Sequence, residues 1–219
     1  MIAEIPFVIL IAAAALVGLW ISNILYDLKV PQYVSRKIGH SAGGLAFLLC
    51  AFVFSSAWWP LILSAAFVAM LGGARFAKPD TFRGVGGSGR PGNVMAEVWF
   101  PLAAIPVLGV GWLWLERPLL AVACILFMAW GDAITGLVRS KVYGRPVKGL
   151  WGSVAMLIAC LVIAWALIEP LWIGALAALV ATVTEWACGD VGVIKKLDDN
   201  LMIPLVSCAV VFGLLCVGG

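Results

Sequence analysis

Residues 5–25 read IPFVILIAAAALVGLWISNIL, a run without a single charged side chain. A helix of about 20 mostly apolar residues is long enough to cross the hydrocarbon core of a bilayer. The run exceeds the roughly 7–15 apolar residues of a signal-peptide core, and no basic segment precedes it. We therefore expect a true membrane-spanning helix here and not a signal peptide.

The rest of the chain resembles this first stretch in composition. Of 219 residues, 64% are hydrophobic and 11% are charged, and the mean hydropathy is +1.11. A soluble domain carries about 25% charged residues, so this chain has too little polar surface for a soluble globule. The net charge of +3 gives no indication of nucleic-acid binding. Because no long polar stretch interrupts the chain, we expect one membrane-embedded domain over residues 1–219.

Further apolar runs of nearly spanning length follow the first. Backbone groups inside lipid must be hydrogen-bonded within their own segment, so each run is predicted to be a helix. The sequence thus predicts an all-α polytopic membrane bundle of about eight transmembrane helices, at residues 5–25, 38–54, 57–74, 94–115, 117–138, 151–168, 171–187 and 201–217.

Lysine and arginine are distributed unequally between the connections. Of the 14 basic residues, Arg117 alone lies in one of the short links at 55–56, 116–117 and 169–170. All others lie in or beside the links at 26–37, 75–93, 139–150 and 188–200. Basic loops face the cytoplasm in membrane proteins, so we expect these links to be cytoplasmic and both termini to be non-cytoplasmic.

The cysteines and the histidine exclude two kinds of site. The six cysteines form no CxxC pair and lie mostly in apolar runs, which predicts buried packing residues instead of a disulfide framework or a zinc site. His40 is the only histidine, so a multi-histidine metal site is excluded.

Three acidic residues fall within predicted spans, near their basic ends: Glu97, Asp132 and Glu185. Ionisable groups inside a membrane are costly and usually functional. Asp132 shares a helical face with Arg139, because the two are seven residues apart. The alternative is that each acid is neutralised by a neighbouring helix or reaches out to water.

A run of oxygen-bearing side chains, Asp198, Asp199 and Asn200, directly precedes the last span. Carboxylates with an amide are hard-oxygen ligands of the kind that Mg²⁺ uses together with substrate phosphates. A solvated loop beside a membrane helix is the alternative. Asp132 is expected at the same membrane face, and this favours a metal site.

Basic residues at two helix starts are candidates for phosphate binding. Arg36 and Lys37 open the second span and could contact lipid headgroups or hold a phosphate, while His40 could transfer a proton or bond a helix end. Lys141 and Lys148 precede the sixth span, where free N–H groups near Ser153 favour an anion. A capped helix after topogenic charges is the alternative for this second start.

Acids, clustered cations and helix starts on one membrane face are typical of Mg²⁺-assisted phosphoryl or nucleotidyl transfer. The apolar remainder of the chain favours a lipidic second substrate that arrives from the bilayer.

Four ordered blocks also carry a family resemblance. They are SRKIGH at 35–40, AEVWFP at 96–101, GD at 131–132 through YG at 143–144 with Lys148 and GSVAM at 152–156, and Glu185 followed by DDNL at 198–201 and IPL at 203–205. The set resembles the CTP-dependent polyprenol kinases, which include phytol kinase and dolichol kinase. The short chain is closer in length to the phytol kinase-like members.

The resemblance implies transfer of the γ-phosphate of CTP to an isoprenoid alcohol with a divalent metal. The basic connections predict that this site lies at the cytoplasmic face. The resemblance also implies a nucleotide and metal site of Asp132, Lys148, Glu185, Asp199 and Asn200, with Arg36, Lys37, His40 and Glu97 as further site residues.

Within that site we assign roles as hypotheses. Asp132, Glu185 and Asp199 would hold Mg²⁺, and Lys148 and Arg139 would neutralise the transferring phosphoryl group. The alcohol proton would pass to His40 or to a carboxylate. Further phosphate-binding candidates are Lys141, Ser153 and Asp198.

The chain departs from the family pattern beside the expected phosphate site. Arg139 stands where the family usually has Gly, and Gly149 stands where a Ser or Thr commonly follows the lysine. Two other functions therefore stay open: a CTP:lipid-phosphate cytidylyltransferase and an ion-coupled transporter. A bundle of this size could act as a monomer or as a homodimer.

Overall fold

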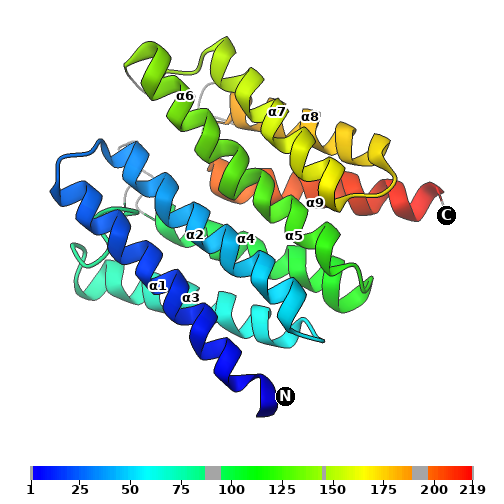
Figure 1. Ribbon diagram of the computed structural model, residues 1–219, viewed down its shortest axis with the longest axis horizontal. Coiled ribbons are helices and arrows are strands. Elements are labelled where there is room, and N and C mark those ends of the chain that lie inside the picture. The colour runs from blue at the N-terminus through cyan, green and yellow to red at the C-terminus, as the bar shows by residue number, and fades with distance from the viewer. Residues whose placement is uncertain (1, 87–94, 145–146, 189–196, 219) are drawn as a thin grey trace.

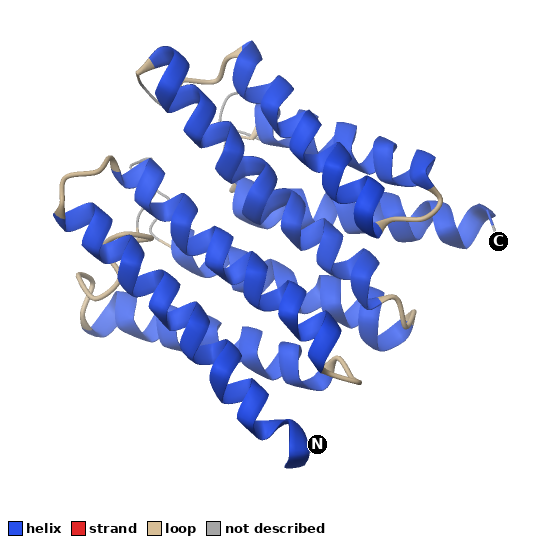
Figure 2. Ribbon diagram, viewed as in Figure 1, coloured by secondary structure: helices blue, strands red, loops and turns tan. Residues whose placement is uncertain are grey.

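The computed structural model describes residues 2–86, 95–144, 147–188 and 197–218. Within these ranges the chain is helical and contains no β-strand (Figure 2). The α-helices are α1 Ile5–Asp27, α2 Gln32–Val53, α3 Trp58–Ala77, α4 Ala96–Leu108, α5 Pro118–Leu126, α6 Ala133–Tyr143, α7 Leu150–Leu167, α8 Leu171–Ala187 and α9 Asp199–Gly218. The all-α class expected from the sequence is confirmed.

Two of the helical rods are composite. A π-helical turn η2, Gly109–Trp114, extends α4, and a second one, η3, Phe127–Asp132, joins α5 to α6 into one rod. Each of the predicted apolar runs thus lies on its own helical rod among the described residues. Six rods are long and apolar enough to cross a membrane. The other two are α2, which opens on a polar stretch, and α8, which has 17 residues.

Successive rods run in alternating directions (Figure 1). One end of the bundle, here called the polar end, holds the last turns of α1, α3, α6 and α8 and the first turns of α2, α4, α7 and α9. The described chain begins and finishes at the opposite end, where the short links at 54–57, 115–117 and 168–170 also lie. The basic connections predicted to share one face therefore adjoin the same end of the bundle.

The composite rod of α5, η3 and α6 forms the centre of the bundle. All side chains from Ala121 to Ala129 are fully buried, against α2 on one side and α4, α7 and α9 on the others. A helix that is apolar all round is stable in such a position, because every face finds an apolar neighbour. The centre thereby carries Asp132, at the C-terminal end of η3, into the interior.

The outer surface of the bundle is apolar and aromatic. Trp20 on α1 is 63% exposed and Trp165 on α7 is 74% exposed. Trp58, Trp114 and Trp172, all more than half exposed, lie with Trp165 near the end opposite the polar end. Exposed tryptophans at one level are typical of a membrane interface. Together with the spanning helices, they establish a polytopic membrane bundle.

The cysteines lie mainly inside the bundle. Five of the six are buried, Cys216 is exposed, and none of them forms a disulfide within the described chain. The prediction of packing cysteines is thus confirmed for five and wrong for Cys216, which lies on the last turn of α9 beyond the packed core.

Candidate active site

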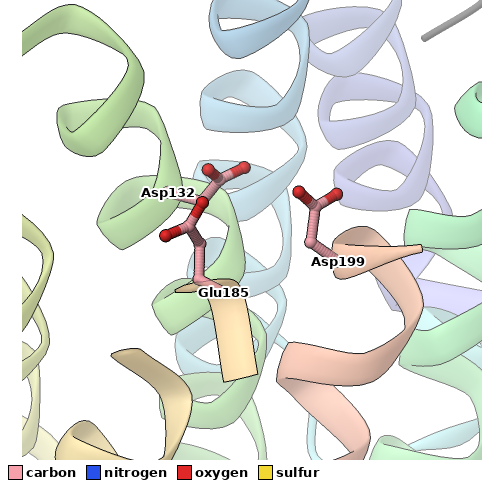
Figure 3. A group of neighbouring side chains, drawn as sticks. All are labelled: Asp132, Glu185 and Asp199. Carbon is pink, nitrogen blue, oxygen red and sulfur yellow. The ribbon is translucent and has the colours of Figure 1, made fainter. Parts of the chain in front are cut away.

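Three carboxylates from distant parts of the chain meet at the polar end (Figure 3). Asp132 ends η3, Glu185 lies in the last turn of α8, and Asp199 begins α9. One oxygen of each lies within 4.8 Å of the others, and the three residues are 1–5% exposed. Acids so close and so buried repel one another unless cations compensate them.

Asp132 and Glu185 are each compensated by a basic side chain. Lys37 on α2 forms an ion pair with Asp132. Arg139 on α6 grips Glu185 with two hydrogen bonds, Nη1 to Oε1 at 2.8 Å and Nη2 to Oε2 at 3.0 Å. This paired geometry is the strongest contact between arginine and a carboxylate. The cluster is therefore a network of ion pairs and not a set of bare acids.

Lys148 stabilises the end of α8. Its Nζ lies 3.4 Å from Oε1 of Glu185 and donates to the backbone carbonyls of Glu185, Trp186 and Cys188, the last at 2.5 Å. The last carbonyls of a helix lack partners within the helix, and a lysine there satisfies them. The sequence assigns Lys148 to the transferring phosphoryl group. In this structure Lys148 contacts the turn that presents Glu185.

Two glycines make room for the long basic side chains. A Cβ on Gly136 would lie 3.1 Å from Cε of Lys37, and a Cβ on Gly152 would lie 2.3 Å from Nε of Arg139. The absence of a side chain at Gly136 therefore lets Lys37 pass close to α6 on its way to Asp132. The role of Gly152 was not foreseen, because its partner lies 13 residues earlier on another helix.

A methyl group at Gly152 is therefore expected to damage the site without unfolding the bundle. In Gly152→Ala, the Arg139 side chain must move, and its paired contact with Glu185 is lost or lengthened. Removing one oriented charge contact in such a site costs about 10²-fold or more in rate. The matched control is Gly73→Ala on α3, where a Cβ meets nothing within 4 Å. Wild-type turnover in Gly152→Ala would show that the Arg139–Glu185 geometry is dispensable.

The start of α9 supplies further oxygen atoms. Oδ1 of Asp198 accepts the Asn200 backbone N–H at 2.9 Å, which is a helix-capping contact. Nδ2 of Asn200 donates to the Ala96 carbonyl at 3.2 Å and so joins α9 to α4. Oδ1 of Asn200 is fully buried and has no hydrogen-bond partner among the described residues. An orphaned amide oxygen next to Asp199 fits a site for a hard cation.

A second polar group lies on α2 and α4, beside the carboxylate cluster. The His40 ring packs on Phe100 with a centroid distance of 5.3 Å, and neither ring nitrogen has a partner within the described chain. His40 is 4% exposed and close enough to Asp199 to interact electrostatically. Glu97 is also buried and lies 3.8 Å from Nε of Arg75. His40 on α2 and Glu97 on α4 thus extend the candidate site beyond the three carboxylates.

The remaining candidates are more peripheral. Lys141 is exposed on α6, and no ion pair joins it to a described residue. Ser153 is half-buried in the first turn of α7. Arg36 is half-buried beside His40, with a buried Nε that has no partner in the described chain. The basic residues Arg90, Arg145, Lys195 and Lys196 lie outside the described residues.

Two curated plant proteins are similar to this chain. One is "Probable phytol kinase 2, chloroplastic" of Oryza sativa subsp. japonica, 26% identical over 197 residues, which cover 80% of this chain and 64% of the relative. The other is "Phytol kinase 1, chloroplastic" of Arabidopsis thaliana, 26% identical over 205 residues, which cover 81% of this chain and 65% of the relative. The chain thus spans just under two thirds of the length of these relatives.

No family model and no solved structure matches the chain. The two similarities nevertheless cover 80% and 81% of the chain, which is thus similar to phytol kinases, in agreement with the resemblance of the ordered sequence blocks.

Proposed function

We propose that this chain is a membrane-embedded kinase that transfers the γ-phosphate of CTP to the hydroxyl of an isoprenoid alcohol such as phytol, geranylgeraniol or a polyprenol. The observation that carries the proposal is the buried cluster of Asp132, Glu185 and Asp199, with its cations, at one end of a lipid-facing bundle. The similarity to phytol kinases supports the reaction class, and the abundance of basic residues at the polar end supports a cytoplasmic active site.

The carboxylate cluster fits a divalent cation such as Mg²⁺. Its three oxygens are close enough to share one ion, and the orphaned Oδ1 of Asn200 offers another hard ligand nearby. Asp132, Glu185 and Asp199 would hold the ion, whose positive charge would offset the negative charge of the phosphate oxygens.

The basic residues then divide into two tasks. Arg139 and Lys148 hold Glu185 in place, the first through its carboxylate and the second also through the carbonyls of α8. Lys37, by contrast, has Asp132 as its partner and lies along Gly136. If Asp132 binds a cation, the ammonium group of Lys37 is released and can turn to a phosphate. Lys37 is thus the cation that we assign to the phosphoryl group.

The proposed transfer needs a base for the alcohol. The hydroxyl oxygen forms a bond to the γ-phosphorus, the bond from that phosphorus to the β-phosphate oxygen breaks, and CDP leaves. The hydroxyl proton passes to a nitrogen of His40, which has no described partner to compete for it. The Phe100 ring packs against the His40 ring at an interplanar angle of 32°.

A dual-label experiment tests the proposed reaction. Purified protein in lipid nanodiscs receives Mg²⁺, phytol or a lipid phosphate, and CTP that carries label either on the γ-phosphate or in the base. We expect γ-label to reach phytol, base label to stay in water, and EDTA to abolish the transfer. Asp132→Asn protein serves as the control for contaminating kinases.

Other outcomes would refute the kinase. Base label in the lipid phase would identify a cytidylyltransferase, in which a lipid phosphate attacks the α-phosphorus. Absence of transfer together with ion-coupled flux in liposomes would identify a transporter.

A further inference from the structure

An apolar cavity of about 70 Å³ lies between α1, α2, α3 and α4, next to the carboxylate cluster. Its walls are formed by side chains such as Ile11, Ala15, Phe47 and Leu63. We propose that this cavity, called the acceptor slot below, receives the hydrocarbon chain of the alcohol substrate and determines its chain length. This inference rests on the proposed kinase function and extends it to the second substrate.

The slot has a polar side that suits a hydroxyl group. His40 and Glu97 both line it, and both belong to the candidate active site. Ser64 also lines it, but its hydroxyl already donates to the Pro60 carbonyl at 2.7 Å. The His40 nitrogens are buried without a described partner, which is costly unless a ligand supplies one. An alcohol placed with its oxygen at His40 would satisfy that need.

The charge of the lining residues selects the kind of head group. The slot is lined by no lysine or arginine among the described residues, and its one carboxylate, Glu97, is near Arg75. A phospholipid phosphate would find no cation there, whereas a neutral hydroxyl needs only a hydrogen-bond partner. We therefore assign the slot to a neutral alcohol and not to a bulk phospholipid.

The slot extends along the helices and away from the polar end. On α2 its lining runs from Gly39 to Cys50, a distance of about 16 Å at 1.5 Å per residue. On α1 it runs back from Leu19 to Ile11, about 12 Å by the same rise. A long and narrow space of this kind fits a thin hydrocarbon chain lying parallel to the helices.

Small residues create the width of the slot. Ala12 and Ala15 on α1 line it, as do Gly43 and Ala46 on α2. A Cβ on Gly43 would already lie 2.8 Å from the Phe100 ring. Larger side chains at these positions would fill the space, so the alanines are the residues that we expect to set the accepted chain length.

The packing of α1 and α3 suggests how a chain dissolved in the membrane would reach the slot. α1 packs mainly along α2, and α3 packs mainly along α4, while α1 and α3 touch each other little. The most apolar stretch of α3 is only 17% buried within the bundle. The seam between α1 and α3 is therefore a weakly packed side of the slot. A membrane-dissolved chain can enter there without leaving the lipid.

The substitution Ala12→Phe tests the slot, with Ala13→Phe as its matched control. Ala12 lines the slot, whereas Ala13 is the next residue on α1 and is exposed on the outer surface. We expect Ala12→Phe to lower the kcat/KM ratio of geranylgeraniol to geraniol by roughly 10- to 100-fold, as altered pocket size does in other enzymes. Ala13→Phe should leave that ratio unchanged. An unchanged ratio in Ala12→Phe, with activity retained, overturns the proposal.

A photoreactive prenol separates failure of the slot from failure of the kinase. Geranylgeraniol with a diazirine at the chain end is irradiated with the wild-type protein in nanodiscs, and labelled residues are located by mass spectrometry. We expect label at Ile11, Ala12 or Leu63, and its removal by excess phytol. Such labelling in a protein without kinase activity would sustain the slot and refute the kinase. Labelling confined to lipid-facing residues such as Val17, which phytol does not displace, would refute the slot even in an active kinase.

Discussion

Replacing Asp132 by asparagine is expected to lower the rate of phosphoryl transfer by about 10²–10³-fold, the loss seen when one oriented electrostatic group is removed from an active site. Asp132 is central to the carboxylate cluster and is 3% exposed. The substitution keeps the shape of the side chain but removes the charge that the cation would require. The measurement is label transfer from CTP to phytol at saturating Mg²⁺.

Two further variants distinguish lost chemistry from lost folding. Asp132→Asn leaves Lys37 without its described ion-pair partner, which is itself destabilising. The double variant Asp132→Asn with Lys37→Gln should regain thermal stability in detergent and remain inactive. Asp27→Asn, which removes an exposed partner of Arg83, should retain full activity. Near wild-type turnover in the Asp132→Asn protein would exclude Asp132 from the active site.

Replacing Arg139 by methionine is expected to have the largest effect on stability. Both carboxylate oxygens of Glu185 bind its guanidinium, and Glu185 is 1% exposed. Loss of one partner from a buried ion pair costs about 3–5 kcal/mol. We expect a loss of about 3 kcal/mol, at the lower end of this range, because Lys148 Nζ remains 3.4 Å from Oε1 of Glu185. Unfolding in detergent, followed by circular dichroism, measures the change.

The control for this prediction is a similar ion pair at the surface. Nη2 of Arg83 lies 3.1 Å from Oδ2 of Asp27, and both side chains are about half exposed. Arg83→Met should therefore cost only about 0–1 kcal/mol. Adding Glu185→Leu to Arg139→Met should restore stability, since an apolar pair tolerates burial, but should not restore activity. Equal losses in Arg139→Met and Arg83→Met would show that the buried pair contributes no special stabilisation.

The positions of the helices could be predicted because the part of a helix that lies in lipid is apolar. Helix ends that lie outside the apolar run are polar, so hydropathy does not locate them. The second run was expected from residue 38, yet α2 begins at Gln32 and includes the polar residues up to Lys37. The fifth run was expected to end at residue 138, yet its rod continues to Tyr143. There Gly144, with φ 64°, ends the helix.

The acidic residues of the candidate site could be identified from the sequence, but the contacts between its residues could not. Asp132 and Glu185 were conspicuous as acids in apolar runs, and Asp199 belonged to an oxygen-rich segment. The convergence of all three, however, depends on the packing of η3, α8 and α9, which no local pattern encodes. From the sequence, Arg139 and Lys148 are assigned to the phosphoryl group. In the structure both side chains lie within ion-pair distance of Glu185.

Two features of the site have no signal in a single sequence. The need for glycine at position 152 is evident only from the structure, where the Arg139 side chain occupies the space that a Cβ would fill. The acceptor slot is lined by residues of four helices, so it depends on how these helices pack together. In the sequence, its alanines cannot be distinguished from ordinary packing residues. Of its polar residues, Glu97 is a nucleotide-binding candidate in the sequence and His40 a candidate acceptor of the alcohol proton. Both line the space that we assign to the alcohol.

Anomalous X-ray diffraction with Mn²⁺ tests the metal-dependent site most directly. Crystals are soaked with Mn²⁺ and a CTP analogue that cannot transfer its γ-phosphate. A manganese peak bound by Asp132, Glu185 and Asp199, with the γ-phosphate beside it and Lys37 turned away from Asp132, is the predicted result. Manganese and nucleotide bound elsewhere, with the Lys37–Asp132 pair still intact, would contradict the proposed active site.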